Sequence, residues 1–216
     1  MPADPRQTLI TAAHRMTAEG LNRGTAGNLS LRGKLDGAQG FYVTPTGMAY
    51  ESLQAEDIPF VRLEDGSHVG RRLPSSEWRF HRDFYAARPE VGAVLHAHSP
   101  FATALACLRR DIPPFHYMIA RFGGDTVRCS GYATFGTQAL SDMALAALSG
   151  RKGCLLANHG MLVGGKDPAE ALALGVELES LCEQFWRASQ LGEPVLLNAE
   201  EMAEALEKFV GYGKQA

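Results

Sequence analysis

Hydrophobic and polar residues first follow a helical and then a strand period along the chain, which predicts a mixed α/β fold. The Asp4-Pro5 pair is typical of a helix start, and Leu9 and Ala13 follow it at helical spacing. Between residues 28 and 63 the pattern changes to short strand-like runs separated by glycine-containing turns. The first part of the chain therefore predicts one helix followed by a hairpin-rich sheet. The strand-like runs are 29–32, 41–44 and 58–63.

The rest of the chain mixes helices and strands without strict alternation. Further helices are predicted over 75–88, 99–109, 137–148, 167–189 and 200–210, and extended segments over 91–98, over 115–119 and around His159-Gly160. The first of these helices is expected to bury Phe80, Phe84 and Ala87. This order favours a three-layer α/β sandwich on a central, mainly antiparallel sheet over a doubly wound parallel sheet. No repeat or linker divides the chain, so residues 1–216 are expected to form one domain.

The composition is that of a globular protein that does not bind nucleic acid. The chain has 216 residues, of which 45% are hydrophobic, and a formal net charge of -3 with charges of both signs interspersed. Such a chain lacks the basic footprint that nucleic acid requires. No apolar run approaches the roughly 18 residues that span a bilayer, and the N-terminus lacks a secretory pattern. We therefore expect a cytoplasmic protein with no membrane partner.

The most informative local pattern is His96-Ala97-His98, at the end of an apolar run. Alternate residues of a strand project from the same face with Cα atoms roughly 6.6 Å apart, so both imidazoles can bind one ion. His159 follows another apolar run and precedes Gly160, which places it at a strand end. Three neutral imidazoles leave a zinc ion an open position, which is typical of a catalytic site. Taken singly, each histidine is also compatible with a structural role.

Glu77 is the candidate carboxylate for this site, because it follows Ser75-Ser76 at a predicted helix start. A carboxylate at that position also stabilises a helix by roughly 0.3 to 1 kcal/mol, so Glu77 alone is weak evidence. The two hydroxyls and the free backbone N–H groups form an anion site. Segments 24–28 and 44–47 can join it, although each is also an ordinary turn. Neither matches a nucleotide-binding loop, so a small phosphorylated metabolite is the predicted ligand.

These motifs together resemble the class II (zinc-dependent) aldolase and adducin family. The matching segments are spread over the whole chain in the family's order, which makes chance a poor explanation. They are GTAGNLSLR (24–32), TPTGMAYESL (44–53), LPSSEWRFH (73–81), HAH (96–98), HYMIA (116–120), GYATFGTQALS (131–141) and NHG (158–160).

The resemblance implies a role for each candidate residue. It implies that His96, His98 and His159 hold one Zn²⁺ per subunit and that Glu77 is the acid/base, which also approaches the metal when substrate is absent. Tyr117 is implied to be a proton donor beside the aldehyde. The pairs implied to bind phosphate are Gly27 with Asn28, Thr46 with Gly47, and Ser75 with Ser76.

The resemblance also implies a homotetramer with active sites between subunits and a C-terminal tail, carrying Tyr212, that contacts the site. The implied activity is reversible cleavage of a ketose 1-phosphate, similar to L-fuculose 1-phosphate, to dihydroxyacetone phosphate and a small aldehyde. Arg121 and Phe122 are bulky where a fuculose enzyme is expected to have small residues. Cleavage of 5-deoxyribulose or 5-methylthioribulose 1-phosphate is therefore an alternative.

Other activities of the family are alternatives as well. Decarboxylases and dehydratases of sugar phosphates use the same metal chemistry, and 4-epimerases carry Asp where this chain has Glu77. An adducin-like assembly module is the alternative without catalysis. The intact set of three histidines and Glu77 favours the enzyme. None of the five lysines lies within an apolar strand, so the sequence offers no candidate for a Schiff base.

Overall fold

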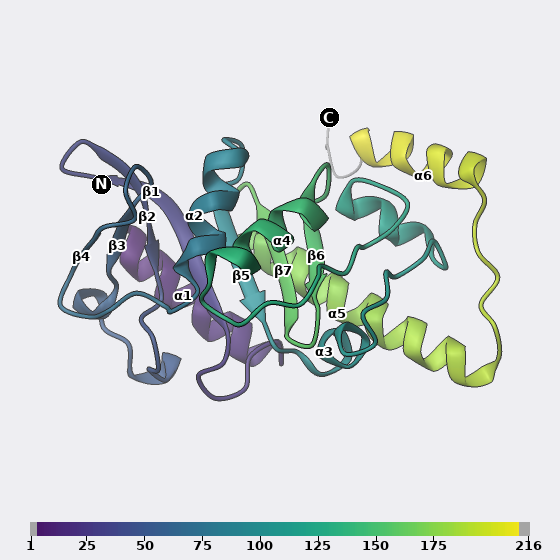
Figure 1. Ribbon diagram of the computed structural model, residues 1–216, viewed down its shortest axis with the longest axis horizontal. Helices are drawn as coiled ribbons and strands as arrows, with labels where there is room; N and C mark the ends of the chain where they lie inside the picture. Colours follow the sequence, from purple (N-terminus) through teal and green to yellow (C-terminus); the bar gives the residue numbers. More distant parts are fainter. Residues whose placement is uncertain (1–3, 212–216) are drawn as a thin grey trace.

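A computed structural model describes residues 4–211, in which a seven-stranded sheet lies between two layers of helices (Figure 1). The strand order is β4-β3-β2-β1-β5-β7-β6, and every neighbouring pair is antiparallel. The predicted three-layer sandwich on a mainly antiparallel sheet is therefore confirmed. The strands are β1 (Asn28–Leu35), β2 (Ala38–Val43), β3 (Phe60–Arg62), β4 (His68–Val69), β5 (Ala93–Ala97), β6 (Gly153–Leu156) and β7 (Gly160–Gly165).

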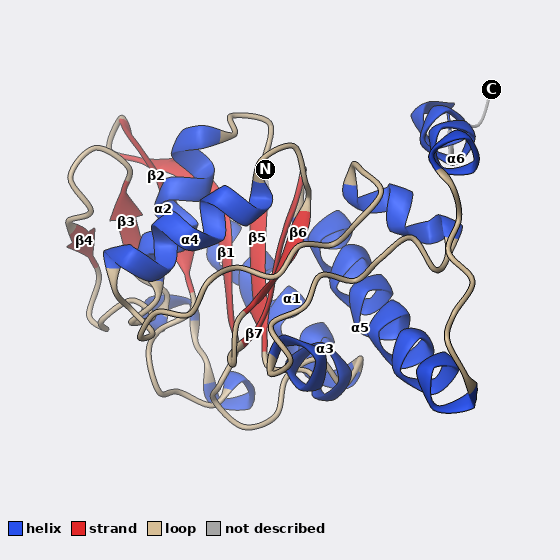
Figure 2. Cartoon of the chain, turned by 45° about the vertical axis from the view of Figure 1, so that its right-hand side comes forward, coloured by secondary structure: helices blue, strands red, loops and turns tan. Residues whose placement is uncertain are grey.

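Each face of the sheet is covered by its own group of helices. Figure 2 shows α2 and α4 on one face and α1 behind the sheet on the other, where α3 and α5 also pack. The helices are α1 (Pro5–Ala18), α2 (Trp78–Ala87), α3 (Pro100–Ala106), α4 (Gln138–Leu148), α5 (Pro168–Leu191) and α6 (Ala199–Gly211), with 3₁₀ turns η1 (Tyr50–Ser52), η2 (Ala55–Asp57) and η3 (Tyr117–Phe122). Among residues 4–211, no helix combines the length and hydropathy needed to cross a lipid bilayer.

Strand β5 lies in the middle of the sheet and is buried on both faces, which explains its unbroken apolar sequence. Leu95 packs into the core beneath α1, α3 and α5, whereas Val94 packs into the core beneath α2 and α4. Because alternate residues of a strand share a face, His96 points to the same side as Val94. Its ring lies 5.4 Å, centroid to centroid, from the ring of Phe80 on α2.

Helix α2 differs in two ways from the prediction. It begins at Trp78, three residues later than expected, and Glu77 is its N-cap residue. Phe80 and Phe84 are buried as predicted, but Ala87 is exposed, so that part of the prediction was wrong. The buried face instead includes the polar side chain of His81, which lies beside Phe80 toward the sheet.

The segment expected to be extended over 115–119 is mostly the 3₁₀ turn η3, so this prediction was also wrong. The reason is a local hydrogen bond: the His116 side chain accepts from the backbone N–H of Met118 and caps the turn. Gly123 ends the turn with a φ of 90°, a conformation that glycine adopts readily. Helix α6 packs against this turn at the end of the molecule away from β4 (Figure 1).

A buried carboxylate anchors the loop that leads to α2. Asp57 is 2% exposed, and its Oδ1 accepts from Arg71 Nη2 at 2.7 Å and from Arg72 Nε at 2.9 Å. These charged hydrogen bonds, the one from Arg72 foremost, lower the pKa of Asp57 to about 2 although burial opposes ionisation. The anchor fixes the chain just before the segment that carries Ser75 and Glu77.

Candidate active site

The strand register brings the three predicted histidine ligands together. His96 lies on β5 and His98 directly follows it on the same face, while His159 lies in the turn between β6 and β7. A Cβ added at Gly160 would lie 2.3 Å from the carbonyl oxygen of Ala97, so only glycine allows this close approach of the two backbones. The imidazole centroids are 4.7 to 4.8 Å apart in each pairing of the three rings.

Glu77 reaches the same point from the start of α2. Its Oε2 lies 3.2 Å from Nε2 of His96, and its Oε1 lies 3.3 Å from Nε2 of His159. The Nε2 atoms of His96 and His98 are 2.9 Å apart. One potential ligand atom from each of the four residues lies within 4.8 Å of the other three. The structure thus brings together all four residues that the sequence predicted for the metal site.

The donor set of this cluster fits a divalent cation. Nδ1 of His96 lies 2.8 Å from the carbonyl oxygen of Met161, and because a carbonyl only accepts, Nδ1 carries the proton. The Nε2 of a neutral His96 therefore presents a lone pair to the Glu77 carboxylate, which also only accepts. Oε1 of Glu77 is buried without a hydrogen-bond partner. Acceptor atoms that converge in this way repel each other unless they share a cation, and imidazole nitrogens with a carboxylate are common ligands of divalent transition metals.

The protonation states of the cluster also suit a metal. Burial lowers the pKa of His98 and of His159 to about 4, so both rings are neutral at neutral pH. Burial opposes ionisation of Glu77, but the neighbouring imidazoles of His96 and His159 and the hydrogen bond from Asn28 lower its pKa to about 2. Neutral imidazoles and an ionised carboxylate are the forms that bind metal.

The three segments predicted to bind phosphate lie side by side next to this cluster. The backbone N–H of Leu29 donates to Oγ1 of Thr44, and the N–H of Thr44 donates to the carbonyl of Leu29. The N–H of Ser75 donates to the carbonyl of Thr44, and the N–H of Thr46 donates to the carbonyl of Leu73. Backbone and hydroxyl hydrogen bonds thus join segments that are far apart in the sequence.

The predicted phosphate-binding residues differ in exposure. Thr46, Gly47 and Ser76 are exposed and accessible to a ligand. Ser75 is buried, and its Oγ accepts from the backbone N–H of Glu77 at 3.3 Å, which fixes the start of α2. The exposed members of the set are therefore the ones placed to contact an anion directly.

Gly27 and Asn28 are both buried next to the cluster. A Cβ at Gly27 would lie 2.9 Å from the carbonyl oxygen of His96, so the glycine permits a close approach to β5. The Asn28 side chain donates from Nδ2 to Oε2 of Glu77 at 3.0 Å, and its Oδ1 lies 2.6 Å from Nε2 of His81. Sequence reasoning assigned no role to His81, and no spacing in the sequence links it to Asn28.

A pocket of about 350 Å³ opens beside the cluster. Two of its lining residues, Tyr132 and Phe135, are aromatic and are 54% and 64% exposed. Both belong to a segment that matched the family, but the sequence gave no reason to assign them a function. The lining residues are Ala26, Ser76, Glu77, His98, Tyr132, Ala133, Phe135, Asn158 and His159.

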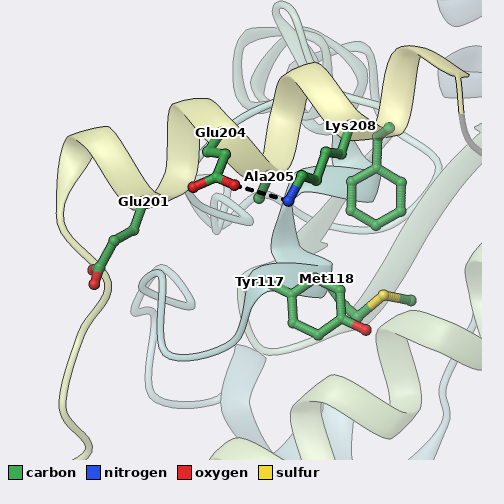
Figure 3. A pocket seen from close by; sticks show the side chains of 7 residues that line it. Tyr117, Met118, Glu201, Glu204, Ala205 and Lys208 are labelled. Carbon is green, nitrogen blue, oxygen red and sulfur yellow. Dashed lines mark ion pairs between the residues drawn. The ribbon is translucent and has the colours of Figure 1, made fainter.

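Tyr117 lies in a different pocket. It is 54% exposed on η3 and faces α6, where Glu204 and Lys208 form an ion pair across the pocket from it (Figure 3). Its ring stacks on that of Phe209 with the centroids 6.4 Å apart. It is not among the residues that line the pocket beside the cluster of Glu77 and the three histidines. Tyr212 lies outside the described residues.

The two bulky residues after Tyr117 do not line the pocket of the cluster. Phe122 is fully buried in the core beneath α1, α3 and α5. Arg121 forms an ion pair with Glu177 on α5, with Nη1 2.7 Å from Oε2. The size of these two side chains therefore carries no information about the pocket beside the cluster in the same copy.

Comparison with known proteins gives consistent results over nearly the whole chain. Residues 7–186 match the family described as the class II aldolase and adducin N-terminal domain. A 5-methylthioribulose-1-phosphate/5-deoxyribulose-1-phosphate aldolase of Rhodospirillum rubrum is 53% identical over 211 residues, which cover 98% of this chain and 93% of that protein. An L-fuculose phosphate aldolase of Escherichia coli K12 is 43% identical over 206 residues, which cover 95% and 94%.

A solved structure of an L-fuculose 1-phosphate aldolase has the same fold. It superimposes with a TM-score of 0.91 at 39% identity, and the match covers 97% of this chain and 98% of that one.

Proposed function

The chain belongs to the class II aldolase and adducin family, and on this basis we propose that it cleaves a ketose 1-phosphate to dihydroxyacetone phosphate and a small aldehyde. The observation that carries the proposal is the convergence of Glu77 with His96, His98 and His159 beside the pocket. An adducin-like assembly module would have no need for such a cluster. The aldolase relatives further favour retro-aldol cleavage over decarboxylation, dehydration or epimerisation.

We assign the metal to the three imidazoles, with one Zn²⁺ per subunit as the proposed ion. When bound, a divalent ion supplies a Lewis acid that stabilises negative charge on substrate oxygens. The chain's own side chains offer no substitute for it. Lys34, Lys152, Lys166 and Lys208 are all exposed, so no lysine among residues 4–211 has the buried amine that a Schiff-base aldolase requires.

Glu77 is the proposed acid/base that moves the proton at the third carbon of the ketose phosphate. Its Oε2 is held by the Asn28 amide, whereas its Oε1 has no hydrogen-bond partner. An ionised carboxylate can take this proton from dihydroxyacetone phosphate in the condensation direction, and the resulting carboxylic acid can return it to the same carbon in cleavage. Thr46, Gly47 and Ser76 are the exposed groups that we assign to the phosphate.

The aldehyde half of the substrate is proposed to carry an apolar end. Tyr132, Ala133 and Phe135 line the pocket next to His98 and His159 and provide an apolar, largely aromatic wall. Aromatic edges make favourable contacts with thioether sulfur as well as with methyl groups. We therefore propose 5-methylthioribulose and 5-deoxyribulose 1-phosphate as substrates, in line with the 53% identical relative. L-Fuculose 1-phosphate is the second candidate, favoured by the similar solved structure.

Cleavage assays with these three ketose 1-phosphates test the proposal. We expect the metal-loaded enzyme to release dihydroxyacetone phosphate from all three substrates. The highest kcat/KM is expected with 5-methylthioribulose and 5-deoxyribulose 1-phosphate. Prior treatment with a chelator should abolish the release, and added Zn²⁺ should restore it. A coupled assay for dihydroxyacetone phosphate provides the measurement. Failure to cleave any of the three substrates would contradict the proposed activity, and full activity after chelation would contradict the metal mechanism.

Because Tyr117 and Glu77 line different pockets, we propose that an active site is completed by Tyr117 of the partner subunit within a homotetramer. In the condensation direction a phenol can donate its proton to the alkoxide that forms from the aldehyde oxygen, and in cleavage the phenolate can take that proton back from the hydroxyl on the fourth carbon. In this arrangement each subunit supplies its metal cluster to one site and a phenol to another.

Mixing two inactive variants tests this arrangement. Coexpression of Glu77→Gln with Tyr117→Phe should give hybrids with about a quarter of the wild-type activity, because one pairing in four joins an intact Glu77 to an intact phenol. Each variant alone should remain inactive, and kcat of the purified hybrid is the measurement. Hybrids as inactive as the two parents would show that Tyr117 does not act across the subunit boundary.

A further inference from the structure

A buried chain of polar side chains runs behind Glu77, away from the pocket. It starts at Tyr85 on α2 and passes through Ser30 on β1 to His81 on α2. From there it continues through Asn28 on β1 to Glu77. Every member is 5% exposed or less. The successive contacts are Tyr85 OH to Ser30 Oγ at 2.8 Å, Ser30 Oγ to His81 Nδ1 at 2.7 Å, His81 Nε2 to Asn28 Oδ1 at 2.6 Å and Asn28 Nδ2 to Glu77 Oε2 at 3.0 Å.

The ionised carboxylate at one end fixes the direction of every hydrogen bond in this chain. Glu77 only accepts, so Asn28 must turn its NH₂ group toward it and its carbonyl oxygen toward His81. Nε2 of His81 must then carry a proton and donate. In a neutral ring Nδ1 has no proton and accepts from the hydroxyl of Ser30, which in turn accepts from Tyr85. Each group has one role, and reversing any bond would bring two acceptors together.

Burial supports the neutral form of His81 that this order requires. The side chain is fully buried between the rings of Phe80, at 4.8 Å, and Phe41, at 6.2 Å. Burial lowers the pKa of His81 to about 3. A buried polar ring costs stability unless it is hydrogen-bonded. The hydrogen bonds of His81 to Ser30 and Asn28 therefore allow the ring to be buried at this position.

We propose that His81 is a positioning residue for Glu77 and that it acts through the amide of Asn28. Its Nε2–H donates to the Asn28 carbonyl oxygen, which keeps the NH₂ group on Oε2 of Glu77 and leaves Oε1, which has no hydrogen-bond partner, as the oxygen that moves the proton. Without this donor the Asn28 amide can rotate by about 180° and present an acceptor to the carboxylate. The inference rests on the proposed role of Glu77 as the acid/base.

Two substitutions of His81 distinguish loss of its Nε2–H donor from loss of its packing in the core. The amide nitrogen of Gln can reach the place of imidazole Nε2, whereas the shorter Asn reaches only the place of Nδ1. We expect His81→Asn to lower kcat about 10- to 100-fold, as is typical when a group that orients a reactive residue is removed. KM and the metal content per subunit should stay close to wild type. His81→Gln should keep most of kcat.

A packing variant of the same helix provides the control. Phe84 is 1% exposed and takes no part in the polar chain, so Phe84→Leu should lower Tm without lowering kcat at a temperature where the protein is folded. If His81 has only a structural role, its variants should behave in the same way as Phe84→Leu. Equal kcat values for His81→Asn and His81→Gln would likewise overturn the proposal.

A double-mutant cycle with Asn28→Ala tests whether the effect passes through the amide. In the Asn28→Ala background, His81→Asn should lower kcat no further, because the group that it orients is gone. If instead the fold-reductions in kcat of the two single variants multiply in the double variant, the proposal is overturned.

If His81→Asn does not fold, the cycle is measured with Ser30→Ala, which removes the hydroxyl that donates to Nδ1 of His81. Wild-type kcat in these variants alongside an inactive Glu77→Gln would refute this inference alone. Wild-type kcat in Glu77→Gln would refute the proposed acid/base role of Glu77, and failure of the wild-type enzyme to cleave any of the three ketose phosphates would refute the proposed function.

Discussion

Replacing Glu77 with Gln is expected to lower kcat for ketose 1-phosphate cleavage about 10²- to 10⁴-fold, while the protein keeps its metal. Gln matches Glu in shape and can still contact Asn28, but its amide cannot take up a proton at the free oxygen. The three imidazoles remain in place, because each is positioned by the backbone of its own strand or turn. The measurements are kcat from dihydroxyacetone phosphate release and metal per subunit from elemental analysis.

A matched control for this variant is Glu177→Gln. Glu177 is a half-buried carboxylate that pairs with Arg121, but it lies on α5 and does not line the pocket of the cluster. It should retain wild-type kcat. If Glu77→Gln turned over substrate at the wild-type rate, Glu77 would not be the acid/base. Loss of metal together with activity would instead assign Glu77 to metal binding.

The metal cluster could be predicted from the sequence because its chemistry and geometry are local. The period of a strand places His96 and His98 on one face wherever the strand lies in the sheet. His159 could be placed at a strand end, but only the pairing of β5 with β7 brings it beside His98. That pairing joins segments more than sixty residues apart, and no periodicity reports it.

The polar chain behind Glu77 could not be predicted for a related reason. The spacing of Phe80 and Phe84 indicated a buried helical face. Continuing that face by three residues predicted that Ala87 is buried, which was wrong. His81 and Tyr85 lie one position further round the helix from those two residues, and the same face turns them into the core. Their burial depends on the hydroxyl of Ser30 on β1, because a polar side chain is buried in a core only where it finds a hydrogen-bond partner.

The placement of Tyr117 shows a different limit of sequence reasoning. The family resemblance implied its role but not the copy of the chain in which it acts. The segment around it was expected to be extended, whereas a side-chain cap makes it the 3₁₀ turn η3, which faces α6. Which surfaces meet in an oligomer is a property of the assembled surfaces rather than of local spacing. A site that spans subunits therefore cannot be built from periodicity within one chain.

Replacing His96 with Ala is expected to remove both the metal and the activity. His96 is fully buried, and its Nδ1–H bond to Met161 directs Nε2 into the cluster. Without it two imidazoles remain, and a donor set with one fewer nitrogen holds zinc far less tightly. The fixed orientation of the ring is lost as well, and groups that orient a ligand are commonly worth 10- to 100-fold in affinity. After dialysis we expect little metal and no measurable cleavage.

Zinc titration separates loss of the ligand from loss of the fold. Chelated wild-type protein should regain activity when Zn²⁺ is added, whereas His96→Ala should stay inactive at the same concentration although circular dichroism shows it to be folded. His68→Ala is the matched control, because His68 is exposed on β4 and lies outside the cluster. It should keep both metal and kcat. An active His96→Ala protein without metal would contradict the site as a whole, since the carboxylate and the phenol would then suffice for the cleavage.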